Sequence, residues 1–170
     1  MRIFLIGFMG CGKSSIGEEL AKSLNYSFLD LDHYIEKNED ARIVDIFNEK
    51  GEDEFRKIEH TYLKNIVLFN NTVIATGGGT PCYFNNMEII KHNGVSIYLK
   101  YNADTLSLRL FKNKNQRPLL KEFTHINDLK TYINELLKKR EHFYMQSDII
   151  LEEEKISVNT IVEALSSYLV

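Results

Sequence analysis

The residues with the clearest chemistry are 7–14, which read Gly-Phe-Met-Gly-Cys-Gly-Lys-Ser. A glycine, four further residues and Gly-Lys-Ser is the spacing of a phosphate-binding loop, because glycines let successive backbone N–H groups turn towards an anion. Lys13 adds a mobile positive charge and Ser14 offers a hydroxyl to Mg²⁺, while a helix that begins here points the positive end of its dipole at the phosphates. The apolar run at residues 3–6 predicts a strand directly before the loop. We therefore expect the chain to bind a nucleoside triphosphate here.

A second glycine cluster, residues 77–79, follows the apolar run at residues 72–75. Three glycines at the end of a strand allow a ligand to approach the backbone closely, although a flexible turn would use the same residues. In a doubly wound sheet, ligands bind beyond the carboxyl ends of the strands, and both glycine clusters would lie there. We expect the two clusters to border one site.

Two acidic residues end another apolar run, which reads Phe-Leu-Asp-Leu-Asp at residues 28–32. The two-residue period of a strand predicts that Asp30 and Asp32 share one face at the same edge of the sheet. Paired carboxylates in that place suit a magnesium ion and a substrate hydroxyl. Either aspartate could instead cap the helix expected after them, since aspartate is a preferred N-cap residue, and this alternative applies above all to Asp32.

Two arginines lie on or beside apolar helical faces. The apolar stripe of one expected helix includes Glu59, and Arg56 on its flank can pair with Glu59 or with Glu52. The plain alternative is a surface ion pair worth about 0.3–0.5 kcal/mol. Arg140 lies near the centre of the apolar face of a later helix, where a guanidinium needs an anionic partner or a path to solvent. Both arginines are candidates for binding an anion.

The stretch from Lys112 to Leu120 is basic and polar, and it lacks apolar periodicity until its end. Phosphoryl transfer needs positive charge over the γ-phosphate and exclusion of water, and a closing loop that carries Arg117 would supply both. An ordinary solvated loop is the alternative on charge alone. We interpret residues 112–124 as a lid.

The length and composition suit a single compact domain, since 170 residues with 44% hydrophobic content are enough for one domain but too few for two. The net charge of -3 gives no general attraction for nucleic acid, so we expect small-molecule ligands. No apolar run reaches the roughly 20 residues of a membrane helix and no secretory segment begins the chain, which favours a cytoplasmic protein without a membrane partner. Cys11 and Cys82 predict free thiols, and the histidines lack metal spacing.

Short apolar runs alternate with helical patterns along the chain, and crossovers of this length indicate a parallel sheet covered by helices. The expected strands lie at residues 3–6, 28–31, 72–75, 95–99 and 148–151. About forty residues separate the second strand from the third, and they contain two expected helices, around residues 43–49 and 52–69. We interpret residues 33–70 as a substrate-binding subdomain.

In their order along the chain, these motifs resemble those of the shikimate kinase family. The matching residues are Gly10-Cys11-Gly12-Lys13-Ser14-Ser15, Asp30-Leu31-Asp32, Phe55-Arg56-Lys57-Ile58-Glu59, Thr76-Gly77-Gly78-Gly79, Arg117-Pro118-Leu119-Leu120 and Arg140 with Tyr144. The resemblance covers nearly the whole chain and implies an α/β P-loop fold like that of nucleoside monophosphate kinases, with five parallel strands in the order 2-3-1-4-5. It also implies that MgATP and shikimate are converted to ADP and shikimate 3-phosphate, on the route to chorismate and the aromatic amino acids.

The resemblance also implies roles for individual residues and a monomeric enzyme. Shikimate would be bound by Asp32, Arg56, Gly78 and Arg140, and ATP by Gly10, Cys11, Gly12, Lys13, Ser14, Ser15 and Arg117. Lys13, Asp32 and Arg117 are the expected catalytic residues, and Ser14 with Asp30 would form the magnesium environment. Asp32 is either a general base or mainly an orienting group, because a loose transition state gains little from early proton removal.

The chain departs from the family near its C-terminus, where an arginine commonly approaches the adenine. Here residues 151–156 carry three acids, and Lys155 is a weak substitute for that arginine. Arg109, shortly before the expected lid, could stack on the base instead.

Two other classes of function fit part of the pattern. A gluconate or nucleotide kinase would share the phosphate-binding loop and the fold, but it would not need Arg56 and Arg140 together. The second class is a nucleotide-binding regulator without catalysis, or a domain that presents a surface to a protein partner. The intact Lys13, Asp32 and Arg117 argue against a loss of catalysis.

Overall fold

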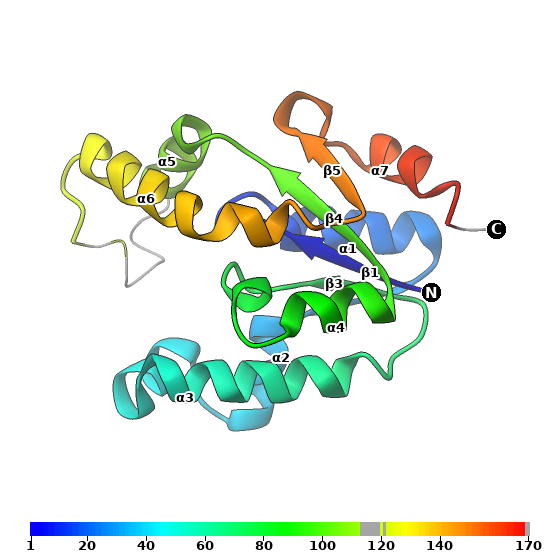
Figure 1. Cartoon of the computed structure of the whole chain (residues 1–170), viewed down its shortest axis with the longest axis horizontal. Coiled ribbons are helices and arrows are strands. Elements are labelled where there is room, and N and C mark those ends of the chain that lie inside the picture. The colour runs from blue at the N-terminus through cyan, green and yellow to red at the C-terminus, as the bar shows by residue number, and fades with distance from the viewer. Residues whose placement is uncertain (113–119, 121, 169–170) are drawn as a thin grey trace.

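The computed structural model describes residues 1–112, 120 and 122–168, and its centre is a five-stranded parallel sheet in the order β2-β3-β1-β4-β5 (Figure 1). The strands are β1 (Arg2–Ile6), β2 (Ser27–Asp30), β3 (Thr72–Ala75), β4 (Val95–Lys100) and β5 (Ile149–Glu152). Each one lies within one residue of a predicted strand at either end. The α/β fold class and the strand order are confirmed.

The middle strand β1 explains why the strand sequences read as continuous apolar runs. Leu5 of β1 is paired with Ala75 of β3 on one side and with Ile97 of β4 on the other. Parallel strands covered by helices on both faces are buried on both faces, so polar residues cannot alternate with apolar ones. Because all five strands run the same way, the segments that follow them emerge at one edge of the sheet.

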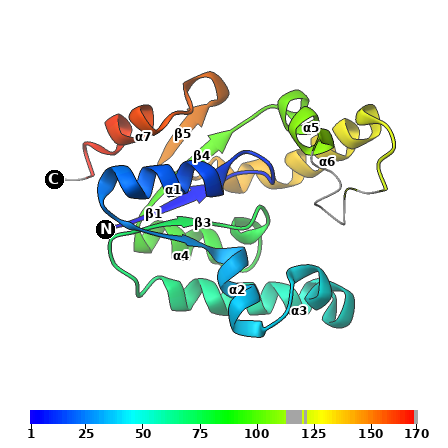
Figure 2. The same cartoon turned by 180° about the vertical axis from the view of Figure 1, so that it is seen from behind.

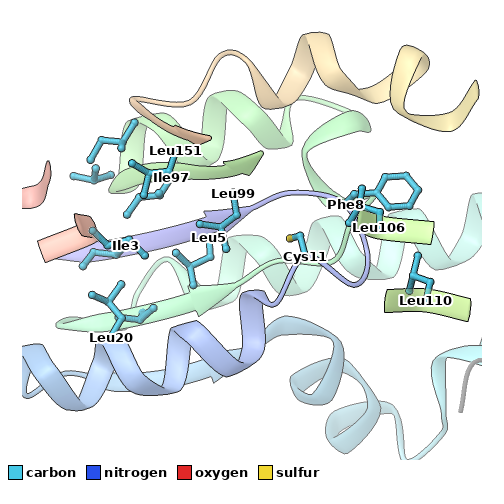
Figure 3. Packing of buried hydrophobic residues seen from close by; sticks show 14 of the residues in the cluster. Ile3, Leu5, Phe8, Cys11, Leu20, Ile97, Leu99, Leu106, Leu110 and Leu151 are labelled. Atoms are coloured by element: carbon cyan, nitrogen blue, oxygen red, sulfur yellow. The ribbon is translucent and has the colours of Figure 1, made fainter. Parts of the chain in front are cut away.

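Helices cover both faces of the sheet. Figure 1 shows α4 and α6 in front of the sheet, and the opposite view in Figure 2 shows α1 in front. The helices are α1 (Lys13–Leu24), α2 (Leu31–Glu39), α3 (Ile43–Ile66), α4 (Asn86–Asn93), α5 (Ala103–Lys112), α6 (Ile126–Tyr144) and α7 (Val158–Leu165), with short 3₁₀ turns η1 (Thr80–Cys82) and η4 (Glu153–Lys155). Ile3 and Leu5 face a core shared with α1, α5 and α7 (Figure 3), whereas Phe4 and Ile6 face a core shared with α3 and α4. The two cores follow directly from the two-residue period of β1.

Helix α3 contains a break at Gly51, where φ is 80° and ψ is 171°. This backbone conformation lies outside the helical region and favours glycine. The two helices predicted for residues 43–49 and 52–69 are therefore present and meet at this residue. α3 packs beside α2 and α4 at the β2 side of the molecule (Figure 1). The interpretation of residues 33–70 as a substrate-binding subdomain stays a prediction.

Within the described part of the chain, no helix combines the length and the apolar character needed to cross a membrane. Most of the predicted lid at residues 112–124 is not described, because residues 113–119 and 121 lie outside the described residues. The lid therefore stays a prediction as well.

Candidate active site

The loop between β1 and α1 wraps around the ammonium group of Lys13. Lys13 Nζ donates to the backbone carbonyls of Gly7, at 2.8 Å, and Phe8, at 2.9 Å, and the side chain is buried. Gly10 and Gly12 have φ values of 80° and 94°, in the left-handed region that favours glycine. The loop therefore has the positive φ glycines, the central cation and the following helix that a phosphate group requires.

Cys11 contributes its backbone rather than its side chain to this loop. Its side chain is 2% exposed and belongs to the same buried cluster as Leu5 and Leu106 (Figure 3). Cys11 Sγ lies 3.7 Å from Lys13 Nζ, on the core side of the loop. A phosphate at this loop would meet the backbone of Cys11, because the thiol packs in the interior.

Asp30, at the end of β2, connects the phosphate-binding loop to α2. Ser14 Oγ donates to Asp30 Oδ2 at 2.5 Å, and Asp30 Oδ1 accepts from the backbone N–H groups of Asp32 and His33. Asp30 is thus the N-cap of α2, and the prediction that Asp32 could cap this helix is wrong. The strand-period argument for the two carboxylates is wrong too, because β2 ends at Asp30 and Asp32 lies in the first turn of the helix.

Asp32 nevertheless faces the glycine loop after β3. A Cβ atom on Gly77 would come within 2.9 Å of both Asp32 Oδ1 and Glu59 Oε1, so a larger residue here would displace these carboxylates. Burial raises the pKa of Asp32 to about 6, with support from the negative charges of Asp30 and Glu59, while the charge of Lys13 acts in the opposite direction. Asp32 therefore titrates close to neutral pH, as a group that handles a proton often does.

Arg56 is the buried cation on the other side of the glycine loop. Arg56 Nη1 lies 2.9 Å from Glu59 Oε2, and Nη2 lies 3.0 Å from Glu52 Oε1. Both alternatives considered for this arginine are present, but Glu59 is 1% exposed, so its pair with Arg56 is not a surface ion pair. The guanidinium also stacks 4.3 Å from the centre of the Tyr83 ring.

The two arginines contact neighbouring glycines of the same loop. A Cβ atom on Gly79 would come 2.6 Å from Arg56 Nη1, and one on Gly78 would lie 3.7 Å from Arg140 Nη1. Arg140 reaches this loop from α6, 84 positions further along the chain than Arg56. The structure thus places Arg56, Gly78 and Arg140, which come from three separate segments, around one loop.

The positive charges of Arg56 and Arg140 both favour the ionised forms of Cys82 and Glu52. Burial raises the pKa of Cys82 to about 11, and the charges of Arg140 and Arg56 oppose that increase. Burial also disfavours the ionised form of Glu52, but a hydrogen bond from Tyr83 and the neighbouring arginines outweigh this effect and lower the pKa of Glu52. Two guanidinium groups therefore lie around one glycine loop, and the charge of Arg56 is balanced by Glu52 and Glu59.

A pocket of about 380 Å³ adjoins the phosphate-binding loop. Its lining includes Cys11, Gly12, Ser15, Ile16, Glu19, Tyr101, Arg109 and residues 156–159. Arg109 stacks 4.2 Å from the centre of the Tyr101 ring and borders this pocket, whereas Lys155 does not line it. Of the two residues considered for the adenine, the pocket contains Arg109.

Arg117 lies outside the described residues, so its position relative to Lys13 stays a prediction. The groups around Arg56, namely Glu52, Glu59, Thr80 and Tyr83, were not predicted as site residues. A signal in the sequence existed for Glu52 and Glu59 only, because their helical spacing lets either pair with Arg56.

Comparison with known proteins agrees with this geometry. A family model described as shikimate kinase matches residues 9–169. A shikimate kinase from Azobacteroides pseudotrichonymphae genomovar. CFP2 is 44% identical over 165 residues, which is 96% of either chain. A crystal structure of shikimate kinase from Bacteroides thetaiotaomicron has a TM-score of 0.91 at 37% identity, covering 99% of this chain and 98% of that one.

Two further structures separate likeness of family from likeness of fold. A shikimate kinase from Acinetobacter baumannii in complex with shikimate has a TM-score of 0.85 at 31% identity, covering 99% of this chain and 92% of that one. A gluconokinase from Sinorhizobium meliloti 1021 has a TM-score of 0.56 at 16% identity, covering 99% of this chain and 91% of that one, which is a likeness of fold alone. The chain therefore belongs to the shikimate kinase family of ATP-dependent kinases.

Proposed function

We propose that the protein transfers the γ-phosphoryl group of MgATP to the 3-hydroxyl of shikimate, which yields ADP and shikimate 3-phosphate. The observation that carries this proposal is the approach of Arg56 and Arg140 to adjacent glycines of one loop, beside Asp32 and the phosphate-binding loop. Shikimate has a carboxylate at one end and ring hydroxyls at the other. The site offers two planar cations for the first and an acceptor carboxylate for the second.

Asp32 would accept a hydrogen bond from the 3-hydroxyl and direct its oxygen at the phosphorus. With a pKa of about 6, Asp32 is mostly ionised at neutral pH, yet basic enough to take the proton late in the transfer. Because the transition state of phosphoryl transfer is loose, orientation is the larger part of the contribution we assign to Asp32.

Lys13 and Arg117 would stabilise the charge of the transferring phosphoryl group. Lys13 already lies at the centre of the phosphate-binding loop, and its ammonium needs only to exchange the Gly7 and Phe8 carbonyls for phosphate oxygens. Arg117 would add a second cation from the lid and help to exclude water, on the family resemblance.

Shikimate kinases work with ATP and a divalent metal ion, and we propose Mg²⁺ held through Ser14 and the nearby Asp30. Among residues 1–112, 120 and 122–168, no three His, Cys, Asp or Glu side chains form a metal cluster. This fits magnesium in kinases, which binds one or two protein groups together with phosphates and water. When bound, the ion would neutralise phosphate charge.

The adenine would lie in the pocket beside Ser15 and Ile16, against Arg109 on Tyr101. The guanidinium of Arg109, which borders this pocket, would stack on the base. We further propose a monomer in the cytoplasm that acts on small molecules only, a setting that suits its two free cysteines.

A coupled ADP-release assay with shikimate, gluconate and the common nucleoside monophosphates tests the proposal. We expect turnover with shikimate alone, a poor response to shikimate methyl ester, and a steep increase in KM for shikimate in Arg56→Ala and Arg140→Ala, with KM for ATP nearly unchanged. Each charge-assisted hydrogen bond lost corresponds to roughly ten- to a hundredfold in affinity. Turnover of gluconate or of a nucleoside monophosphate at a normal rate would contradict the proposal. Absence of ADP release with every substrate tested would contradict it as well.

A further inference from the structure

Tyr144, the last residue of α6, connects this helix to the glycine loop. Its hydroxyl donates to the backbone carbonyl of Gly78 at 2.5 Å, between positions that are 66 residues apart in the chain. The side chain is completely buried, and a buried phenol without a hydrogen bond would be costly. Phenylalanine would fill the same space in the core. What the tyrosine hydroxyl adds is the hydrogen bond to Gly78.

The hydrogen bond fixes the orientation of one peptide group in the site. In a planar trans peptide the carbonyl oxygen and the following N–H point in opposite directions. With the Gly78 carbonyl held by Tyr144, the N–H of Gly79 points away from α6. A Cβ atom on Gly79 would come 2.6 Å from Arg56 Nη1, so the residue that this peptide leads into lies close to the Arg56 guanidinium. Glycine has no side chain to restrain its backbone, so such a loop needs an outside contact to hold one conformation.

Tyr144 is also one helical turn beyond Arg140, so both side chains project from the same face of α6. Arg140 Nη1 lies 3.7 Å from the position of a Cβ on Gly78, whose carbonyl Tyr144 holds. Helix, arginine, tyrosine and glycine loop are therefore joined in one unit. The Tyr144 ring packs on the ring of Tyr98, with 5.2 Å between the ring centres, and this contact anchors the unit in the core.

We propose that Tyr144 is a positioning residue for substrate recognition, which holds the Gly78–Gly79 peptide and Arg140 in the relative geometry that binds the carboxylate of shikimate. The identity of the substrate in this inference rests on the proposed function. The hydrogen bond between Tyr144 and Gly78 does not depend on it. Because its side chain is completely buried, Tyr144 acts through the glycine loop and not by contact with the substrate.

Burial keeps this hydroxyl a donor across the working range of pH. Burial raises the pKa of Tyr144 far above its ordinary value, with a smaller contribution from Cys82, while the charge of Arg140 acts in the opposite direction. The phenol therefore stays protonated, and the restraint on Gly78 does not depend on pH.

The test compares Tyr144→Phe with a matched control, Tyr98→Phe. Both variants remove one phenolic oxygen from the same buried aromatic pair. Only the hydroxyl of Tyr144 donates to the Gly78 carbonyl, whereas Tyr98 belongs to β4. We expect Tyr144→Phe to raise KM and Kd for shikimate roughly three- to twentyfold, the equivalent of one lost hydrogen bond. The KM for ATP and the activity of Tyr98→Phe should stay close to the wild-type values.

Discrimination between shikimate and its methyl ester gives a second readout that loss of stability alone would not change. Tyr144→Phe should prefer the acid less strongly than the wild type does, because the carboxylate-binding groups are no longer aligned. In an Arg140→Ala background the same substitution should have a smaller effect, since coupled residues are not additive. Equal effects of Tyr144→Phe and Tyr98→Phe, or an unchanged KM for shikimate, would show that Tyr144 only packs in the core.

Amide hydrogen exchange of Gly78 and Gly79, followed by NMR without any substrate, separates this inference from the proposed function. Faster exchange at these two amides in Tyr144→Phe, but not in Tyr98→Phe, would support the restraint even for a protein that does not use shikimate. Unchanged exchange would overturn it. Absence of shikimate turnover in the wild type would count against the proposed function alone.

Discussion

Glu59 binds Arg56 from the interior of the protein: Arg56 Nη1 lies 2.9 Å from Glu59 Oε2, and the second carboxylate oxygen accepts from Thr80 Oγ1. Two of the three groups come from α3, and Thr80 directly follows the glycine loop. The buried carboxylate therefore joins the substrate-side helix to the loop that carries Gly79. An arginine held in this way needs little reorganisation before it binds an anion.

Replacement of Glu59 by glutamine should reduce both stability and substrate affinity. Removing one partner of a buried ion pair costs about 3–5 kcal/mol when the other charge is left unpaired. Because Glu52 still pairs with Arg56, we expect a loss below that range. We expect a lower midpoint in urea unfolding and a higher KM for shikimate. Glu54→Gln is the matched control on the same helix, because Glu54 pairs with Lys57 at the surface, where such pairs are worth about 0–1 kcal/mol. Equal stability of the two variants would contradict the role of Glu59.

Gly79→Ala should affect substrate binding more than folding. The backbone of Gly79 has φ of -93°, which alanine adopts without strain, but the new methyl group would come 2.6 Å from Arg56 Nη1. A flexible side chain can move away, so we expect a loss of stability of less than about 1.5 kcal/mol. The displaced guanidinium should raise KM for shikimate roughly tenfold or more. An unchanged KM for shikimate would place the carboxylate elsewhere.

The raised pKa of Asp32 predicts a pH profile for activity. If Asp32 must be ionised to orient the hydroxyl, kcat/KM for shikimate should fall as the pH decreases through about 6, since this parameter reports the free enzyme. Steady-state kinetics between about pH 5 and 8 would measure it. An acidic limb at the ordinary aspartate pKa would show that Asp32 is not shifted or not needed.

The same shift has a consequence for stability. The pKa of Asp32 is 3.8 in the unfolded chain and about 6 in the folded protein, so the folded state binds more protons between these values. Stability contributed by this group therefore falls as the pH rises through this window, by at most about 3 kcal/mol. Asp32→Asn should raise Tm near pH 7, and the difference should disappear near pH 4. A lower Tm for the variant at neutral pH would contradict the burial of a charged Asp32.

Arg109 and Lys155 can be distinguished by their effect on ATP. Because Arg109 borders the pocket next to the phosphate-binding loop, Arg109→Ala should raise KM for ATP, by roughly three- to tenfold for a stacked cation. Lys155→Ala is the control with the same loss of charge and should leave KM for ATP unchanged. KM for shikimate should not change in either variant. The reverse order of effects on ATP would assign the base to the C-terminal segment.

Arg117→Ala should lower kcat far more than it weakens shikimate binding. A cation over the transferring phosphoryl group acts mainly in the transition state, and its loss is worth ~10² or more in kcat. Single-turnover kinetics would separate the chemical step from product release. An unchanged kcat would remove Arg117 from the catalytic set.

Features that depend on short stretches of chain could be predicted from the sequence. The phosphate-binding loop needs its glycines, Lys13 and Ser14 within eight residues, and the strands are short apolar runs because a covered parallel sheet is buried on both faces. The order of the strands came from resemblance to a family, since local pattern does not determine which strands pair.

Details that depend on distant contacts were decided by the tertiary structure. Whether Asp30 or Asp32 caps α2 depends on where β2 ends, and the pairing of β2 with β3 determines this. The thiol of Cys11 points into the core because α1 and α5 pack beneath the loop. Arg56, Gly78 and Tyr144 come from three separate elements, and only the packing of α3 and α6 around the end of β3 brings them together. Sequence pattern reports the periodicity of each element, but the relative placement of elements depends on side-chain packing between them.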